Sequence, residues 1–469
     1  MKKPDDTAAQ TSEHAAPART KWATMAASAL ATLLVAGELS MAAFALPLIG
    51  DDLGVSTGAT AWVLLAYQLP MAALALPAGR WTDKADSRLV FTLALLTLAA
   101  ADVLAGLAPQ FWLLLAARVL QGFAAALYLG VYLPVVSAAV RHDQRGRAMS
   151  YHTALMMVGS VAVAPLGGWL ADSHGWRAVF LARVPPLVLA ALLGWITVPP
   201  AAPGPGGRRL PSPDRGVLAD VALIGTAVTA GLLAVEHGGR HPVPAAALAA
   251  GAVALGVWWA RLPASRPVTS LVRRPSLRLP ALALLGNAAL VGLTSFLLPF
   301  FISDVLGRSP ELLGTAIGVF VVVSALVTPL AGVLADRFDP RSVAAAGGAL
   351  TVLAMVPMFT LDAGAGPVDV TWRLCLVGAA MSLFNSPNMT AILAAVPEGR
   401  AGSAGGITNL ARTLGQTAGP ALAAFGWSAA AGGVAGFRAG AAALTGCVLV
   451  AFLALLAARR HRPHGRAPD

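Results

Sequence analysis

Long apolar segments recur along the whole chain, and short segments that hold most of the charged residues separate them. A helix needs about 20 apolar residues to cross the hydrocarbon core of a bilayer. The pattern therefore predicts an all-α integral membrane protein with fourteen transmembrane helices. Their expected ranges are 23–49, 58–78, 89–108, 110–137, 148–171, 177–198, 217–235, 243–261, 279–302, 310–335, 342–361, 371–396, 403–428 and 436–458.

Composition supports this prediction and narrows the function. Of the 469 residues, 57% are hydrophobic and 12% are charged, whereas soluble domains carry about 25% charged residues. Cys375 and Cys447 lie in apolar segments and the eight His residues lack ligand spacing, so we expect no disulfide framework and no metal site. The sequence contains no Walker loop and no nucleophile elbow, so we expect neither ATP-driven transport nor an enzyme.

The formal net charge of +11 restricts the partners and the orientation. A basic balance can indicate nucleic-acid binding, but the basic residues here lie between apolar segments, which indicates loops at an anionic membrane surface. If the N-terminus is cytoplasmic, 25 of the 33 Lys and Arg residues fall in cytoplasmic segments, five in external segments and three within helices. We therefore expect a cell-membrane protein with both termini in the cytoplasm, and no nucleic-acid partner.

Two polar segments divide the predicted helices into groups. Residues 199–209 are rich in Pro and Gly and cannot continue a helix, and residues 261–278 are basic. About twenty polar residues precede the first apolar segment, which we expect to be a retained helix and not a cleaved signal. The expected organisation is a cytoplasmic tail at 1–22, a six-helix bundle at 23–198, a linker with two extra transmembrane helices at 199–278, a six-helix bundle at 279–458 and a cytoplasmic tail at 459–469.

An internal repeat relates the two six-helix groups. Gly79, Asp83, Lys84, Asp86 and Arg88 recur as Gly332, Asp336, Arg337, Asp339 and Arg341, each 253 residues later. A weaker copy at 168–177 lies in an expected external loop. Inverted repeats nested within two parallel halves are typical of secondary transporters.

Four further motifs carry a resemblance to a known family. They are Arg118-Val-Leu-Gln121-Gly122, Gly159-Ser-Val-Ala-Val-Ala-Pro165-Leu-Gly167-Gly168, the stretch 175–185 beginning Gly175-Trp-Arg177, and Asn409-Leu-Ala-Arg412-Thr-Leu-Gly415. Together with the loop at 79–88, they resemble the major facilitator superfamily and, within it, the fourteen-helix drug:proton antiporter family. The resemblance implies a monomer that exchanges a small organic substrate for protons by alternating access, with the proton gradient as the driving force and no cofactor.

Three positions depart from the pattern of that family. Asp86 stands where the loop usually has Gly, Glu38 stands where the first helix usually has Asp, and Arg183 stands where Asn is usual. The last two leave the class of substrate open.

Glu38, Asp102 and Arg118 are the candidates for proton coupling or substrate binding. An ionisable side chain within a span costs at least about 2.5–3.5 kcal/mol and normally faces a cavity or a partner. The resemblance implies that Arg118 takes part in proton transfer. The alternatives are a Glu38 side chain that reaches water at the outer end of its helix, an interfacial Asp102, and an Arg118 that only organises hydrogen bonds.

Other polar residues within the spans are candidates for lining a central cavity. Side-chain amides and hydroxyls can equally join neighbouring helices, by hydrogen bonds worth about 0.6 kcal/mol on average. The candidates are Tyr67, Gln68 and Gln121 in the first half, and Asn287, Asn385, Asn388, Asn409 and Arg412 in the second.

A third set of residues is expected to control conformational change. In the repeated loops, the first of which begins at Gly79, the charged residues Asp83, Arg88, Asp336 and Arg341 suit a latch between helices, or a set of solvated turns. Pro interrupts helical hydrogen bonding and Gly permits close helix approach, which suits a hinge, a seal or a packing kink. The residues of this second kind are Gly122, Pro165, Gly167 and Gly168.

Three functions remain open at this point. The first is a proton-coupled exporter in which Glu38 and Arg118 couple the proton, and the second is a facilitator-type importer or metabolite carrier on the same fold. The third, a membrane receptor, would need a soluble signalling domain, and the longest hydrophilic segment is the short N-terminal tail. The motif around Pro165 and the predicted helix number favour export.

Overall fold

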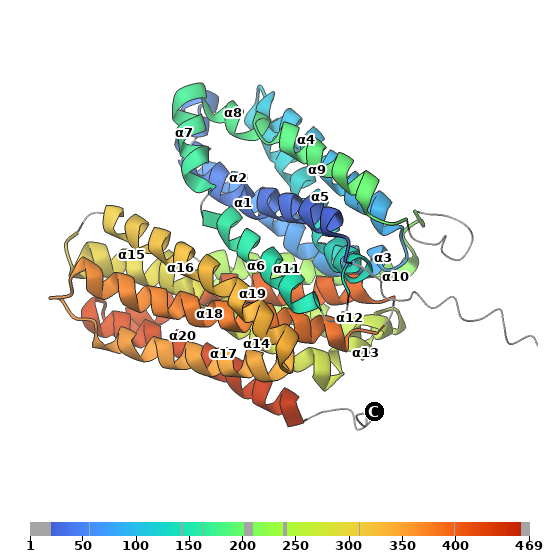
Figure 1. The fold of residues 1–469 in the computed structure, drawn as a ribbon. Helices are drawn as coiled ribbons and strands as arrows, with labels where there is room; N and C mark the ends of the chain where they lie inside the picture. The colour runs from blue at the N-terminus through green and yellow to red at the C-terminus, as the bar shows by residue number, and fades with distance from the viewer. Residues whose placement is uncertain are drawn as a thin grey trace, which may run out of the picture.

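The computed structural model describes residues 20–55, 57–141, 144–161, 163–200, 210–237, 242–308, 310–397 and 399–460. In this part of the chain every regular element is a helix. The helices form two bundles that lie one above the other in Figure 1.

The first bundle contains the helices before the Pro- and Gly-rich segment. Three of its predicted spans are broken in two, and the second piece of each carries a proline in its first turn: Pro77, Pro165 and Pro185. Proline is tolerated there because the first N–H groups of a helix have no intrahelical partner. The helices are α1 Trp22–Leu53, α2 Thr57–Ala73, α3 Ala75–Thr82, α4 Ser87–Gly106, α5 Phe111–Ala139, α6 Arg145–Val161, α7 Ala164–His174, α8 Trp176–Leu181 and α9 Val184–Thr197.

The two inserted helices follow. Arg215–Ala219 (α10), a π-helical stretch at Asp220–Gly225 and Thr226–His237 (α11) make one continuous helix, and Pro242–Arg261 (α12) packs beside it. A 3-10 turn at Pro263–Ser265 then leads into the short α13, Arg266–Val272.

A buried ion pair fastens the insert to the first bundle. Arg80 Nη1 of α3 lies 2.9 Å from Asp220 Oδ2. Trp259 Nε1 of α12 donates to the other oxygen of Asp220 at 2.7 Å. Trp81 Nε1 donates to the carbonyl oxygen of Pro211, 2.9 Å away. These contacts hold the insert, and the segment directly before it, against the C-terminal end of α3.

The second bundle is the lower one in Figure 1. Its first span is irregular, with π-helical stretches at Leu293–Leu297 and Phe301–Val305 on either side of Pro299. The helices are α14 Pro275–Ala288, α15 Leu298–Phe300, α16 Pro310–Arg337, α17 Pro340–Met355 with a 3-10 turn at Val356–Thr360, α18 Pro367–Ala395, α19 Ala401–Ala429 and α20 Gly433–Arg460.

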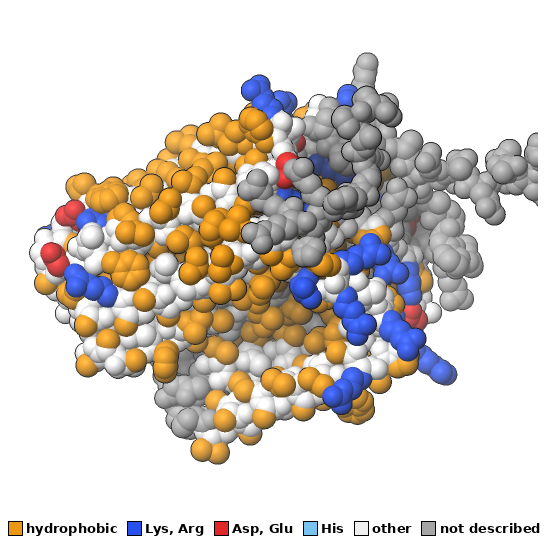
Figure 2. All heavy atoms as spheres, turned by 90° about the horizontal axis from the view of Figure 1, so that it is seen from below, with side chains coloured by type: hydrophobic (Ala, Val, Ile, Leu, Met, Phe, Trp, Pro, Cys, Tyr) orange, Lys and Arg blue, Asp and Glu red, His pale blue; other side chains and the backbone are white. Residues whose placement is uncertain are grey.

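The surface has the distribution expected of a membrane protein. Figure 2 shows hydrophobic side chains over the middle of one face and Lys and Arg side chains gathered at one end. We call this the basic end, defined by Lys84, Arg147 and Arg337, and we call the opposite one, which carries Asp52 and Asp304, the far end.

Eleven helical segments of the described chain are long and apolar enough to cross a membrane, or twelve if α2 and α3, bent by 46°, count as one. The all-helical membrane architecture is thereby confirmed. The predicted spans at 148–171 and 403–428 coincide with α6–α7 and with α19, which are helical but do not pass this test. The number of fourteen therefore stays a prediction.

Candidate functional site

A cluster of buried ionisable residues lies inside the first bundle. Glu38 lies on α1, Asp102 on α4, and Arg118 and Gln121 on α5. Arg183 is the residue directly before α9. Each of the five is at most 3% exposed. The apolar surroundings of four helices thus enclose two carboxylates and two guanidinium groups.

Arg118 is held on several sides. Its Nη1 donates to Glu38 Oε1 and, at 2.8 Å, to Gln121 Oε1. Its Nε donates to the carbonyl oxygen of Val63 at 2.7 Å, and the guanidinium carbon lies 4.9 Å from the ring centroid of Tyr67. A buried guanidinium with this many partners has a defined position, as a role in coupling requires.

Arg183 links the two carboxylates. Its Nη1 contacts Glu38 Oε2 and lies 3.1 Å from Asp102 Oδ1. Gln121 Nε2 donates to the same Asp102 oxygen at 2.5 Å. The cluster is electrically balanced when both acids are ionised, which reduces the cost of burying its charges.

Arg183 is not among the site residues predicted from the sequence. Its position within the predicted span 177–198 could have indicated a role in the site, because a guanidinium inside a span needs a partner. Arg183 and Glu38 are both departures from the family pattern, and they contact each other. The two departures therefore belong to one arrangement.

Replacing Arg183 by Asn is expected to destabilise the protein by about 3–5 kcal/mol, because it leaves two buried carboxylates with one arginine. Thermal unfolding of the purified protein measures this effect. The double variant Arg183→Asn/Asp102→Asn restores the balance, so we expect it to regain most of the loss. A matched control is Arg177→Asn, whose ion pair is exposed and should contribute at most about 1 kcal/mol. A double variant no more stable than Arg183→Asn would contradict the expectation.

The two other polar candidates of the first half, Tyr67 and Gln68, are neighbours on α2. Tyr67 is 1% exposed and packs under Arg118, and Gln68, the next residue of α2, is half-buried. Tyr67 in this conformation is therefore part of the packing around the cluster.

The asparagines of α14 and α18 join these two helices. Asn388 Nδ2 donates to the carbonyl oxygen of Pro280 at 3.1 Å, and Asn287 Nδ2 lies 3.5 Å from Asn385 Oδ1. These contacts match the helix-joining alternative. Asn409 and Arg412 lie on α19, and Arg412 Nη1 reaches Met156 Sδ of α6 at 3.0 Å.

At the basic end, Asp83 connects the two bundles. Its Oδ1 accepts from the backbone N–H of Gly402 at 2.6 Å, and its Oδ2 accepts from the N–H of Ser403 at 2.9 Å and from the Ser403 hydroxyl. The carboxylate thus caps the N-terminus of α19, where the helix dipole favours negative charge. Burial raises the pKa of Asp83 to about 6, so the group is mostly ionised at neutral pH.

Asp336, in the second bundle, makes the equivalent connection to a helix of the first bundle. Its Oδ1 accepts from the N–H of Gly146 at 2.6 Å, and its Oδ2 from the N–H of Arg147 at 3.0 Å, at the N-terminus of α6. The internal repeat thus places one carboxylate from each half on a helix of the other half. We call these two contacts the paired caps.

Glycines bring the two bundles into backbone contact beside the paired caps. A Cβ on Gly79 would lie 2.2 Å from the carbonyl oxygen of Gly402, and one on Gly332 would lie 2.2 Å from Ser150 Oγ. Within the first bundle, a Cβ on Gly122 would lie 2.3 Å from the carbonyl oxygen of Tyr67.

The remaining gating candidates lie elsewhere. The guanidinium of Arg88 lies 4.3 Å from the Trp195 ring centroid within the first bundle, and Arg341 is half-buried at the start of α17. Pro165 lies in the first turn of α7, but its side chain is outside the described part of the structure. In the same helix a Cβ on Gly167 would lie 2.8 Å from Met41 Cα, and Gly168 is half-buried.

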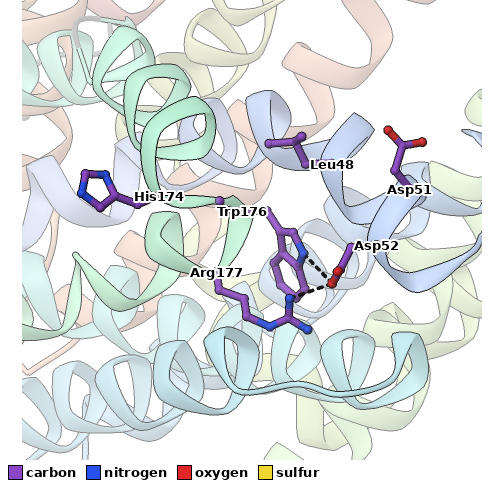
Figure 3. A pocket seen from close by; sticks show the side chains of 7 residues that line it. Leu48, Asp51, Asp52, His174, Trp176 and Arg177 are labelled. Atoms are coloured by element: carbon purple, nitrogen blue, oxygen red, sulfur yellow. Dashed lines mark hydrogen bonds and ion pairs between the residues drawn. The ribbon is translucent and has the colours of Figure 1, made fainter.

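The far end of the first bundle carries an exposed ionic group (Figure 3). Arg177 Nη1 lies 2.6 Å from Asp52 Oδ2, and Trp176 Nε1 donates to the same oxygen at 3.1 Å. These hydrogen bonds lower the pKa of Asp52, and the one from Arg177 has the larger effect. Asp51 and His174 line the same open pocket of about 490 Å³, but their side chains point away from the ion pair. The motif at 175–177 thus ties α8 to the end of α1.

Comparisons with known proteins agree with this architecture. A family model described as Major Facilitator Superfamily matches residues 28–420. The uncharacterised transporter YebQ of Escherichia coli K12 is 27% identical over 82% of this chain and 84% of its own. The riboflavin transporter RibZ of Clostridioides difficile is 25% identical over 86% and 87%, respectively. The multidrug resistance protein Stp of Mycobacterium tuberculosis is 28% identical over 86% and 75%.

A solved structure shares the arrangement of the helices. The human organic anion transporter MFSD10 matches with a TM-score of 0.68 at 15% identity, over 93% of this chain and 99% of that one. At this identity, the likeness concerns the fold alone.

Proposed function

The chain belongs to the major facilitator superfamily, and from this premise we propose that it is a proton-coupled exporter of small organic molecules that works by alternating access. The observation that carries the proposal is the buried cluster of Glu38, Asp102, Arg118 and Arg183. A proton on either acid would cancel one negative charge and leave one guanidinium short of a partner. Such a change in pairing can bias a conformational equilibrium, because a ligand shifts states by its differential affinity for them.

The paired caps supply the conformational element. They join the bundles at the basic end through Asp83 and Asp336, and rocking of one bundle against the other would break both. In the proposed cycle, the basic end opens to admit substrate and closes again when both carboxylates return to their helix termini.

The relatives support a transporter of organic molecules and leave its direction to experiment. Stp is named a multidrug resistance protein, which favours export. RibZ is named a riboflavin transporter, which fits the alternative of a facilitator-type importer or metabolite carrier. Proton movement coupled to substrate would separate the exporter from the facilitator.

We propose further that α6–α7 and α19 also cross the bilayer, which gives the fourteen spans and the two-helix insert of the fourteen-helix antiporters. α19 has 29 residues, and at 1.5 Å per residue its length of about 44 Å exceeds the hydrocarbon thickness. The basic end then faces the cytoplasm, in line with the placement of Lys and Arg. The partners are the bilayer, protons and the substrate, and the protein acts as a monomer.

Fusions of reporter proteins test this topology. We expect a green fluorescent protein fused at the C-terminus to fluoresce, because it stays in the cytoplasm, and alkaline phosphatase fused after His174 or after Ala430 to be active outside. Active phosphatase at both internal positions requires that α6–α7 and α19 cross the membrane. An inactive fusion after Ala430 together with a normal expression level would remove α19 from the spans.

Proton release from everted vesicles tests the function. A preset pH gradient is followed with a fluorescent dye while aromatic and lipophilic compounds of varied charge are added one at a time. Collapse of the gradient by a compound, in vesicles that contain the protein and not in empty ones, is the expected result for an exporter. Uptake of labelled compound without any gradient change would support the facilitator instead.

A further inference from the structure

A second polar group lies between the two bundles, nearer to the basic end than the buried cluster. Arg412 is the twelfth residue of α19 and Met156, which it contacts, is the twelfth of α6, and both helices begin at the basic end. At 1.5 Å per residue both residues lie about 17 Å from that end, near the middle of a bilayer. Arg412 thus sits at half depth, on the seam between the two halves.

The charge of Arg412 is not balanced. Within the described chain no carboxylate lies within 4.0 Å of its guanidinium, which contacts the sulfur of Met156, a weak acceptor. Glu38 and Asp102 are already paired with Arg118 and Arg183. The described ionisable residues therefore leave one positive charge at half depth, where an unpaired charge is costly.

Other unsatisfied polar atoms accompany this charge. Asn409 lies one turn before Arg412 on the same face of α19, and its Nδ2 is buried without a hydrogen-bond partner. His152 of α6 is 4% exposed, and its Nε2 is also buried without a partner. Native proteins leave few buried polar atoms unpaired, and a bound water, ion or ligand is one of the explanations for those that remain.

An aromatic surface lies within reach of the charge. The rings of Tyr132 and His152 are stacked, with centroids 4.2 Å apart and planes at 6°. His152 lies one helical turn before Met156 on α6, and Met156 contacts Arg412. The seam therefore offers one guanidinium and one amide donor beside a flat π surface.

Resting on the proposed transport function, we propose that Arg412 and Asn409 bind the anionic group of the substrate and that the transported class is a small aromatic organic anion. A guanidinium can hold a carboxylate or sulfonate through two parallel hydrogen bonds. An aromatic body then lies against Tyr132 and His152. A lipophilic cation would meet the positive charge of Arg412 and find no free carboxylate among the described residues at this depth.

The helix α19 links the site to one of the paired caps, that of Asp83. Ser403, which bonds to Asp83, lies nine residues before Arg412 on α19, a distance of about 14 Å. An anion that draws Arg412 away from Met156 would therefore act on the helix whose N-terminus Asp83 caps. This gives the substrate a physical connection to closure of the basic end.

Two dyes of nearly equal shape and opposite charge test the proposal. Fluorescein and rhodamine 6G share the xanthene ring and the pendant phenyl ring, but fluorescein is an anion and rhodamine 6G a cation. Fluorescence anisotropy measures their binding to the purified protein without a proton gradient, so a failure of proton coupling and a failure of anion binding are distinguishable. We expect the wild type to bind fluorescein, Arg412→Gln to bind it at least tenfold more weakly, and Asn409→Ala several-fold more weakly.

Controls keep the result specific. Arg438→Gln removes an exposed arginine of α20 and should leave fluorescein binding unchanged. Arg412→Lys keeps the charge but loses the fork of donors, so we expect an intermediate affinity, and this variant serves if Arg412→Gln does not fold. Wild-type binding of rhodamine 6G more tightly than fluorescein, binding of neither dye, or full fluorescein binding by Arg412→Gln would each overturn the proposal.

Discussion

Replacing Glu38 by Gln is expected to reduce substrate-driven proton release more than tenfold while the protein still folds. Gln keeps the shape of the side chain and one acceptor oxygen for Arg118 or Arg183, but it cannot bind and release a proton at neutral pH. The variant also resembles the protonated state permanently, so the cycle lacks the step in which the carboxylate regains its charge. The measurement is dye-monitored collapse of a preset pH gradient in everted vesicles.

The matched control is Asp172→Asn, which makes the same carboxylate-to-amide change at an exposed position of α7. We expect this variant to collapse the gradient at the wild-type rate. If Glu38→Gln also does so, the proton does not bind at Glu38. Asp102→Asn is then the decisive variant, because Asp102 is the other carboxylate that contacts Arg183.

Replacing Gly402 by Ala is expected to prevent closure of the basic end and to lower transport more than tenfold. The added Cβ would lie 2.3 Å from Thr82 Oγ1 and 2.4 Å from the carbonyl oxygen of Gly79. Because the second of these atoms belongs to the backbone, α3 and α19 would have to separate by about 1 Å to reach ordinary contact distance. That separation would also pull Asp83 away from the N-terminus of α19.

Alkylation of a single cysteine measures this opening. Cys375 and Cys447 are first replaced by Ser, and Thr408, which is 1% exposed on α19, becomes the reporter as Thr408→Cys. We expect a water-soluble maleimide to react at least tenfold faster when Gly402→Ala is present. Gly446→Ala is the control, since a Cβ on Gly446 would meet no atom within 4 Å. Equal alkylation rates in the Gly402→Ala protein and its parent would show that the basic end closes despite the methyl group.

Much of the architecture follows from the chain because bilayer thickness limits the length of each apolar segment. Segments such as 89–108 and 371–396 became the helices α4 and α18, with ends shifted by a few residues. The breaks at Pro77 and Pro185 were not predicted, since a proline in a long apolar run is compatible with either a kink or a continuous span.

The candidate site was predictable only in part. Single ionisable residues such as Glu38 and Arg118 are visible in an apolar sequence because burying them is costly. Their partners are not visible, since Glu38 and Arg183 are 145 residues apart and meet only after α1 and α9 have packed. The caps of Asp83 and Asp336 use backbone N–H groups of the opposite half, which carry no signal in the identity of a residue.

The fastening of the insert has a consequence for how far the two halves can separate. Trp259, near the end of α12, is bonded to Asp220 and through it to Arg80 of the first half. Only a few residues later, the carbonyl oxygen of Pro267 accepts from Arg400 Nη1 of the second half at 3.0 Å. The covalent tether between the halves therefore shrinks from the whole 199–278 segment to the eight peptide steps between Trp259 and Pro267. Fully extended, these steps span at most about 29 Å, which sets an upper limit on the width of the gate at this edge while both anchors hold.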